Sequence, residues 1–349
     1  MIILLTAGNQ PCVDSVESHL QAKGADYRRF GFSEYPRQDK MSAVFDQDGA
    51  HFYIEGTERI ACQDVSAFWY WRPATTQANE EFDPEIRHYI ERESKIFISN
   101  LWLMTDHALW FPNPESNRIA NNKPYQLMLA QKIGFTIPET VAGNNADDAR
   151  RLLGRHKKIA IKSLFVGYVT KPLTAPQQVL FQLSKWFAPA QSHEKVPEQL
   201  ENAVVVYTKQ WASEELLAEL DRFNCCPVIL QEYIPKKVEL RITIVGEKVF
   251  TCSIDSQSGD RRTREDWRTS DTPLTHEVYR LPTDIEQKCL QLCKKLGLNY
   301  GCIDMIVTPE DEYVFLEINP LGQWLWVELE TGLPISEAIA DLLIAGKTD

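Results

Sequence analysis

The stretch YGCIDMIVTPEDEYVFLEINPLGQWLWVE, Tyr300–Glu328, carries the strongest fold signal in this sequence. It predicts two β-strands, YGCIDMIV and YVFLEINP, joined by a polar turn at Pro309–Glu312. A symmetric turn at this place pairs Thr308 with Tyr313. Because the remaining strand residues are apolar on both faces, we expect the hairpin to be buried.

The same register sets two carboxylates opposite each other, Asp304 and Glu317. Asn319 lies on the same face as Glu317, since side chains alternate along a strand. Facing carboxylates in a buried hairpin repel each other and lose hydration. A hard cation relieves this, and two carboxylates plus an amide oxygen, with phosphates completing the shell, suit Mg²⁺. The alternative is that one carboxylate is neutral or pairs with an arginine.

The composition predicts a soluble globular protein. The chain has 349 residues, enough for two or three lobes. Hydrophobic residues make up 44% and charged residues 25% of it, which is ordinary for this class. The net charge of −12 argues against a bulk nucleic-acid binder, because no basic excess is set against the phosphates, although a local basic pocket is compatible with it.

The cysteines and the first residues predict a cytoplasmic location. The sequence has eight cysteines and no CxxC pair, which indicates reduced thiols and not a disulfide framework or a zinc site. MIILLTAGNQ, at the start, is apolar but has no basic flank, so we expect a first strand there and no signal peptide. No apolar run approaches the roughly 20 residues that span a bilayer, and no membrane contact is expected.

Strand and helix patterns alternate through the first part of the chain, which predicts a small α/β lobe. One helix is expected over Asn117–Ile133, stopped by Gly134. KIAIKS, Lys158–Ser163, alternates as a strand, and Gly167–Lys171 is expected to return antiparallel to it. Three strands and a helix precede the hairpin: Val228–Tyr233, Val238–Val245, Lys248–Ile254 and Thr283–Leu296.

Two lysines suit the phosphates of a nucleoside triphosphate. Lys123 stands in NNKPYQL, and the alternative for it is a solvated surface lysine. Lys162 follows Ile161 in an apolar strand, so its ammonium group must reach an anion or water. A phosphate and a surface carboxylate are both candidates for that anion. Gly167 is the single glycine after this strand, a poor match to a Gly-rich phosphate loop.

The segment PVILQEYIPKKVELRI, Pro227–Ile242, offers groups for the rest of a nucleotide. Its apolar strand ends in four residues whose backbone can meet an adenine edge: Gln231, Glu232, Tyr233 and Ile234.

Three charged residues are further candidates: Glu239 and Arg241 lie near the end of this segment, and Arg268 lies after it. Glu239 and Arg241 alternate onto one face of the next strand, where Glu239 suits ribose hydroxyls and Arg241 suits a phosphate or an acyl phosphate. The alternative is a structural ion pair between the two. Arg268, in REDWRTS, adds a second cation, with a solvated face as its alternative.

The order of these groups resembles that of an ATP-grasp ligase: Lys123, Lys162, QEYI, ELR, DWR, Asp304 and EIN. In that family two lysines hold the phosphates, a hinge after a strand binds adenine, and an Asp…Glu-x-Asn set holds Mg²⁺. The resemblance implies an α/β ATP-grasp fold in three parts: an N-terminal α/β lobe (1–111), a central lobe (112–225) and a C-terminal lobe with the metal-binding hairpin (226–349).

Within that family the chain resembles the maturases of graspetides, the microviridin-type ω-ester and ω-amide ligases. The motifs that carry this are FWYWRP, NNKPYQLMLAQKIGFTIPET, VELRITIVG, IDSQ with DWR, and EINPLGQWLWVELETGLPI. Members of the family vary at two of these positions. This sequence has Trp71 before Arg72, and it has Leu321 where a second asparagine (Asn-Pro-Asn) is common.

The resemblance implies a role for each candidate residue. ATP and Mg²⁺ are the expected cofactors, and a precursor peptide with a leader segment is the expected partner. Arg241 and Arg268 would steady the γ-phosphate and then the acyl phosphate formed on an Asp or Glu side chain of that peptide. The other expected ligands are Lys123 and Lys162 for phosphates, Gln231, Glu232, Tyr233 and Ile234 for adenine, Glu239 for ribose, and Asp304, Glu317 and Asn319 for Mg²⁺.

Several alternatives remain open from the sequence. Leu173–Arg222 is the candidate leader-binding region, and a homodimer is common in the family without a residue pattern that shows it here. A carboxylate–amine ligase that adds amino acids to a protein or a small molecule would share every ATP residue. An inactive binding protein with a degenerate grasp fold, and a structural protein whose charges are mere ion pairs, are the remaining classes.

Overall fold

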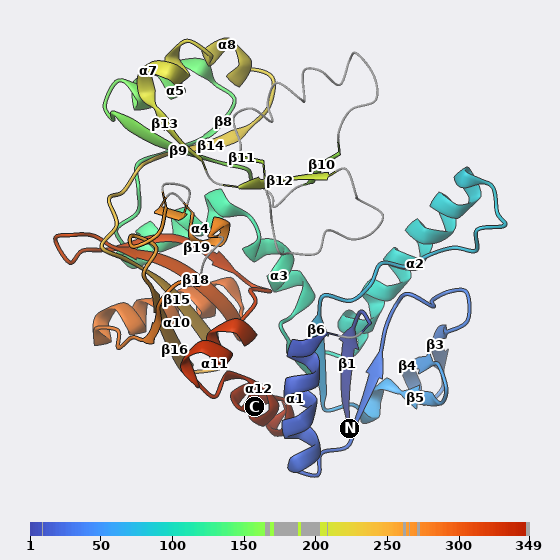
Figure 1. Cartoon of the computed structure of the whole chain (residues 1–349). Helices are drawn as coiled ribbons and strands as arrows, with labels where there is room; N and C mark the ends of the chain where they lie inside the picture. Colours follow the sequence, from blue (N-terminus) through green and yellow to red (C-terminus); the bar gives the residue numbers. More distant parts are fainter. Residues whose placement is uncertain are drawn as a thin grey trace.

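The computed structural model describes the chain from residue 1 to 346 except for residues 9, 165–167, 171–187, 190–202, 208, 261–262, 265 and 271–272. Figure 1 shows three groups of elements: an N-terminal α/β unit, a central sheet with its helices, and a larger C-terminal sheet below it. None of the helices in these ranges is long and apolar enough to cross a membrane.

The N-terminal unit is built on a parallel sheet in the order β2-β1-β6-β7, as the alternating pattern predicts. Its buried strand β1 pairs with both β2 and β6. Helix α1 packs on one face, and the small antiparallel sheet β3-β4-β5 and helix α2 pack on the other. The elements are β1 (Ile2–Thr6), α1 (Pro11–Ala22), β2 (Tyr27–Phe30), β3 (Lys40–Asp46), β4 (Gly49–Glu55), β5 (Arg59–Ala61), η1 (Cys62–Asp64), β6 (Ala67–Trp71), α2 (Pro84–Met104) and β7 (Leu109–Phe111).

The predicted helix Asn117–Ile133 is wrong in one respect, because two helices occupy this stretch. Helix α3 (Pro114–Ala120) is capped by Asn121, and α4 (Lys123–Ile133) begins two residues after that cap. Pro124 explains the break, since proline is accepted in the first turn of a helix but not in its interior. Lys123 therefore stands at a helix start.

The central sheet has the order β13-β9-β14-β8 and is covered on one face by three short helices. The expected pairing of Gly167–Lys171 with the strand before it is wrong: β10 pairs with β12, and β9 pairs with β13 and β14. The elements are β8 (Thr140–Gly143), α5 (Ala146–Leu153), β9 (Lys158–Lys162), β10 (Tyr168–Thr170), β11 (Ala188–Pro189), β12 (Ala203–Tyr207), β13 (Lys209–Ala212), α7 (Ser213–Leu217), α8 (Leu220–Phe223) and β14 (Val228–Glu232).

The C-terminal sheet is antiparallel, in the order β17-β16-β15-β18-β19. One face is apolar and packs on α10 and α4. Because β14 pairs with β8 and β9, we propose that the central lobe extends through Glu232 and not only to residue 225. The elements are β15 (Val238–Val245), β16 (Lys248–Ile254), η4 (Trp267–Thr269), β17 (His276–Val278), α10 (Thr283–Leu296), β18 (Tyr300–Val307), β19 (Tyr313–Asn319), α11 (Leu325–Thr331) and α12 (Ile335–Ala345).

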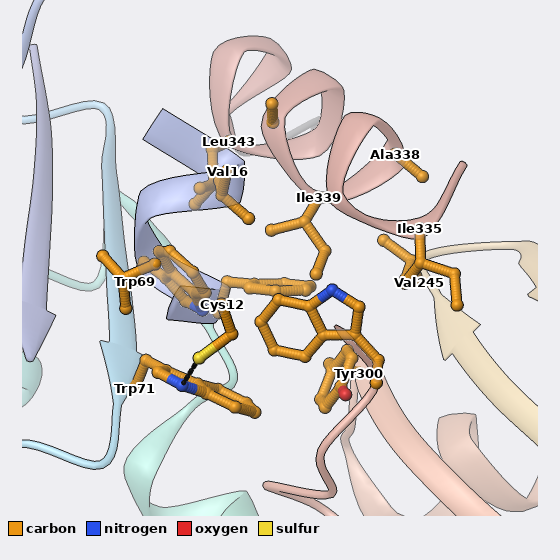
Figure 2. Close-up of a cluster of buried hydrophobic side chains, with 14 of the residues drawn as sticks. Cys12, Val16, Trp69, Trp71, Val245, Tyr300, Ile335, Ala338, Ile339 and Leu343 are labelled. Carbon is orange, nitrogen blue, oxygen red and sulfur yellow. Dashed lines mark hydrogen bonds between the residues drawn. The ribbon is translucent and has the colours of Figure 1, made fainter. Parts of the chain in front are cut away.

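An aromatic cluster joins the N-terminal unit to the C-terminal sheet. Trp71 at the end of β6 packs on Trp324 at 4.6 Å and on Tyr300 at 5.8 Å, measured between ring centroids. Figure 2 shows Trp69, Trp71 and Tyr300 beneath α1 and α12, with the Trp71 indole donating to Cys12 Sγ at 3.1 Å. These buried rings fix the end of β6 against the C-terminal sheet.

Candidate active site

The β18–β19 hairpin places Asp304 directly opposite Glu317, as the sequence predicts. The predicted pair of Thr308 with Tyr313 is wrong, because Tyr313 pairs with Val307. The register shifts by one residue between Asp304 and Met305, which is a β-bulge. Bulges re-aim side chains next to functional sites, and this one restores the register that sets the two carboxylates face to face.

Each of the two carboxylates has a different cation as its partner. Arg241 Nη1 donates to Asp304 Oδ1 at 2.8 Å, and Lys123 Nζ lies 3.1 Å from Glu317 Oε2. The amide nitrogen of Asn319 donates to Asp304 Oδ2 at 3.1 Å and to Glu317 Oε1 at 3.3 Å. Arg241 is therefore the arginine partner that the sequence left open for one carboxylate.

The donor set of the hairpin fits a hard cation. Asn319 lies within hydrogen-bonding distance of both Asp304 and Glu317, and turning its amide presents the oxygen in place of the nitrogen. In the described ranges no group of three His, Cys, Asp or Glu side chains is placed to hold a metal ion by itself, so a metal here would need phosphate or water oxygens to complete its shell. That is the shell in which Mg²⁺ is usually held.

Cations from three separate elements act on Glu317. Burial alone would raise the pKa of this carboxyl. The positive charges of Lys123, Arg268 and Lys162 outweigh that effect and hold the pKa well below its usual range. These side chains come from the start of α4, the η4 turn and the end of β9. The sequence predicted them as separate phosphate ligands, and the structure brings them together around one carboxylate.

Lys162 lies on the open face of the central sheet. Ile159 and Ile161 of the same strand face the covering helices, so the alternating side chain of Lys162 points the other way. Burial lowers the pKa of Lys162 to about 8, Glu317 opposes this, and the nearby cations lower it further. A buried lysine beside other cations is stabilised in its charged form when a polyanion such as a triphosphate binds.

Arg268 is oriented by the residue two positions before it. One edge of its guanidinium group binds the buried Asp266 through two hydrogen bonds: Nε donates to Oδ1 at 2.9 Å and Nη2 to Oδ2 at 3.1 Å. Trp267 stacks on Trp326 at 4.9 Å, which anchors the η4 turn to α11. Asp266 stands in the DWR motif, but no role was predicted for it from sequence.

Glu239 and Arg241 share a face of β15, but the alternative of an ion pair between them is wrong. Lys236 Nζ lies 3.0 Å from Glu239 Oε1, and burial raises the pKa of Glu239. Arg241 is buried, and its Nη2 donates to the carbonyl of Gln323 at 3.0 Å. Lys236 was not predicted from sequence, although it lies within the nucleotide segment Pro227–Ile242.

The expected adenine hinge lies at the end of β14. The Gln231 side chain is buried and donates to Thr140 Oγ1 at 3.1 Å. The backbone N–H of Glu232 donates to Glu139 and that of Tyr233 to Lys158. These bonds fasten the hinge to the chain around β8 and β9. We therefore expect an adenine contact from the residues that follow Tyr233.

A buried glutamine of α4 holds the β18–β19 hairpin and was not predicted. The Gln126 side chain donates to the carbonyl of Ile318 at 2.8 Å and accepts from the Ile318 N–H at 3.0 Å. Ile318 stands between Glu317 and Asn319, and Gln126 is one helical turn after Lys123. Gln126 thus fixes the spacing between the lysine and the carboxylate. Its spacing from Lys123 in α4 was the available signal.

The chain is similar to proteins with a related architecture. Residues 1–118 match the family model of the MvdD pre-ATP grasp domain. No curated protein matches the sequence. The structure is similar to that of a RiPP-associated ATP-grasp ligase from Chryseobacterium gregarium, solved with ADP and a leader and core peptide, at 29% identity and a TM-score of 0.82 over 99% of this chain and 96% of that one.

Two macrocyclases from Microcystis aeruginosa MRC are similar as well. MdnC, solved with the precursor peptide MdnA, has 29% identity and a TM-score of 0.78 over 99% of each chain. MdnB has 27% identity and a TM-score of 0.74 over 98% of each chain. The likeness therefore spans both the N-terminal unit and the two sheets that carry the charged cluster.

Proposed function

We propose that this chain, an ATP-grasp ligase of the graspetide-maturase type, is an ATP-dependent peptide macrocyclase. It activates Asp or Glu side chains of a precursor peptide as acyl phosphates and joins them to Thr, Ser or Lys side chains of that peptide. The observation that carries the proposal is the convergence of Lys123, Lys162 and Arg268 on Glu317, which faces Asp304 across the hairpin.

The chemistry needs two displacements. A peptide carboxylate oxygen attacks the γ-phosphorus of ATP, and ADP leaves. The hydroxyl or amine of a second side chain then attacks the acyl carbon, inorganic phosphate leaves, and the nucleophile gives up its proton. The peptide loses one water for each ω-ester or ω-amide formed, and one ATP becomes ADP and phosphate. Positioned cations supply most of the catalysis, because charge spreads over the transferring phosphoryl group.

The cation cluster performs the binding part of this reaction. Lys123 and Lys162 bind phosphate oxygens from opposite sides, since one stands on α4 and the other on the central sheet. Arg268, held by Asp266, and Arg241, held by Asp304, present guanidinium groups to the γ-phosphate and the acyl phosphate. When bound at the hairpin, Mg²⁺ supplies charge neutralisation at the phosphates.

The hinge and the ribose contact complete the nucleotide site. Gln231, Glu232, Tyr233 and Ile234 flank the adenine, with Ile234 the candidate for a backbone contact, because the N–H groups of Glu232 and Tyr233 already donate to other carbonyls of the central lobe. Glu239 accepts from the ribose hydroxyls. Its neighbour Lys236 keeps this carboxylate oriented at the edge of the site.

The peptide partner carries a leader segment in this proposal. The similar ligase from Chryseobacterium gregarium was solved with a leader and a core peptide, and MdnC with its precursor peptide. The candidate leader-binding region, Leu173–Arg222, lies largely outside the described residues. We also place the reaction in the cytoplasm, because all eight cysteines are described and none forms a disulfide.

A homodimer is part of the proposal, with α2 as its contact. Three exposed large side chains recur every seven residues along this helix, Tyr89, Ile96 and Leu103, and exposed Phe82 lies seven residues before Tyr89, just ahead of the helix. These four positions are symmetric about the midpoint between Arg92 and Glu93. When the α2 helices of two copies pack antiparallel, the apolar side chains of one copy therefore meet those of the other, and Arg92 of each copy meets Glu93 of the other. Light scattering tests it: a dimer that Ile96→Glu dissociates supports this contact, and a monomeric wild type rejects it.

Mass spectrometry of the reaction tests the activity. The protein is incubated with ATP, Mg²⁺ and a short Thr/Ser/Lys- and Asp/Glu-rich peptide encoded beside its gene. Stepwise loss of water from the peptide, absent in Glu317→Ala, supports the macrocyclase. ATP turnover with a gain of mass on a free amino acid acceptor would instead identify a carboxylate–amine ligase. No ATP turnover with either partner would reject both.

A further inference from the structure

Three consecutive carbonyls after the metal hairpin accept hydrogen bonds from three different parts of the fold. Arg72 Nη2 donates to the Leu321 carbonyl at 2.9 Å, and the Tyr300 hydroxyl donates to the Gly322 carbonyl at 2.5 Å. Arg241 Nη2 donates to the Gln323 carbonyl, as described above. We call residues 320–323 the pinned loop. It begins directly after the candidate metal ligand Asn319.

The pinned loop is joined tightly to the site on one side. The N–H of Gly322 donates to the Asn319 carbonyl at 3.0 Å, which closes a turn on the candidate ligand. The guanidinium of Arg241 binds the loop through Nη2 and Asp304 through Nη1. A shift of the loop therefore moves both Asn319 and the partner of Asp304.

Arg72 donates a hydrogen bond from the N-terminal unit to this loop, across 249 residues of sequence. Its backbone has φ of 45°, in the left-handed region that non-glycine residues rarely adopt, and the guanidinium lies 5.6 Å from the ring of Trp71. Trp71 is locked in the aromatic cluster of Figure 2. Strained backbone beside a locked residue is a common feature of groups held for function.

We propose that Arg72 is a positioning residue: it holds the pinned loop against the N-terminal unit and so fixes Asn319, Arg241 and Asp304 in their working geometry. The proposal rests on the proposed function of the hairpin as a Mg²⁺·nucleotide site. Arg72 acts through backbone and side-chain partners of the ligands, as residues that orient metal ligands do. The exposed position of Arg72 means that its removal leaves no buried group behind.

Calorimetric titration of ADP, with Mg²⁺ and with EDTA, tests the proposal without the peptide. Arg72→Ala should weaken ADP binding about tenfold in Mg²⁺ and leave binding in EDTA unchanged. Arg72→Lys should recover part of the loss, because an ammonium group also donates to a carbonyl. Arg59→Ala is the matched control, since Arg59 also lies over a ring, Tyr53, at 4.2 Å, and should bind like wild type.

Thermal unfolding separates positioning from a structural role. Arg72→Ala is expected to keep the melting temperature of the wild type. Wild-type affinity of Arg72→Ala for ADP in Mg²⁺ would overturn the proposal, and so would equal losses in Mg²⁺ and EDTA with a lowered melting temperature. If wild type shows no difference between Mg²⁺ and EDTA, the metal site itself fails, and Arg72 fails with it. Absence of peptide dehydration in wild type would reject the macrocyclase alone.

Discussion

Asp304 and Glu317 face each other across the β18–β19 hairpin, yet each is neutralised by a cation from a different element. Arg241 of β15 binds Asp304 at 2.8 Å, and Lys123 of α4 lies 3.1 Å from Glu317. The carboxylate pair therefore joins β15, α4 and the hairpin into one unit. Glu317 therefore stays ionised at a buried position, which is what a metal or a phosphate-binding cation requires.

Asp304→Asn is expected to lower the free energy of unfolding by about 3 kcal/mol, because it leaves the buried Arg241 without its counter-charge. Chemical denaturation measures this directly. The same variant should lose Mg²⁺-dependent binding of ADP, since a carboxylate ligand becomes a neutral amide.

Asp311→Asn provides the control within the same hairpin. Asp311 pairs with Lys237, but both side chains are exposed, at 69% and 55%. Asparagine also accepts the positive φ of 64° at this position. Its free energy of unfolding should change by less than about 0.5 kcal/mol. Equal losses in the two variants would contradict the buried role of the Asp304–Arg241 pair.

Lys162 predicts how nucleotide affinity depends on pH. Its pKa of about 8 means that the free protein loses this charge as pH rises through 8. Bound phosphates favour the charged form and raise the pKa, so affinity is constant below pH 8 and falls above it, by up to about tenfold per pH unit. Titrations of ADP between pH 7 and pH 9.5 measure the inflection.

Lys162→Arg is the informative variant for this dependence. Arginine stays charged over the whole range, so the inflection near pH 8 should disappear while binding at pH 7 persists. An unchanged inflection in Lys162→Arg would assign the titration to another group.

The sequence predicted the facing of Asp304 and Glu317 correctly, although the predicted pair next to the turn, Thr308 with Tyr313, was wrong. The turn closes between Thr308 and Glu312, where the Thr308 N–H donates to the Glu312 carbonyl. One extra residue, Leu316, then shifts the register back at Asp304. A single-residue bulge leaves an all-apolar strand pattern unchanged, so periodicity alone could not reveal it.

The groups that hold the candidate ligands in place could not be predicted, although the candidates themselves stand out in the sequence. Charged residues in apolar strands stand out because burying a charge is costly. Gln126 and Tyr300 act on backbone groups, and every residue offers those. Gln126 reaches across 192 residues, and Arg72 across 249. Contacts of that range depend on how the sheets pack, which a motif does not specify.

Gln126→Met is expected to destabilise the fold by about 2–4 kcal/mol, because the N–H and the carbonyl of Ile318 both lose their buried partner. Urea denaturation measures the loss. Gln131→Met, on the exposed face of the same helix, should stay within about 0.5 kcal/mol of wild type. A small effect of Gln126→Met would show that water or a neighbouring side chain replaces the amide.

Gly322→Ala is expected to disturb catalysis through sterics alone. A Cβ at this position would lie 2.5 Å from Cys302 Cβ and 2.8 Å from Arg241 Nη2, so the loop or the arginine must move. Since a displacement of about 1 Å near reacting groups can cost about 100-fold, kcat for peptide dehydration should fall by that order. Gly154→Ala is the control: its Cβ would meet its nearest atom, Arg150 O, at 3.5 Å, an ordinary contact. A wild-type kcat in Gly322→Ala would mean that the position of Arg241 is not critical for the reaction.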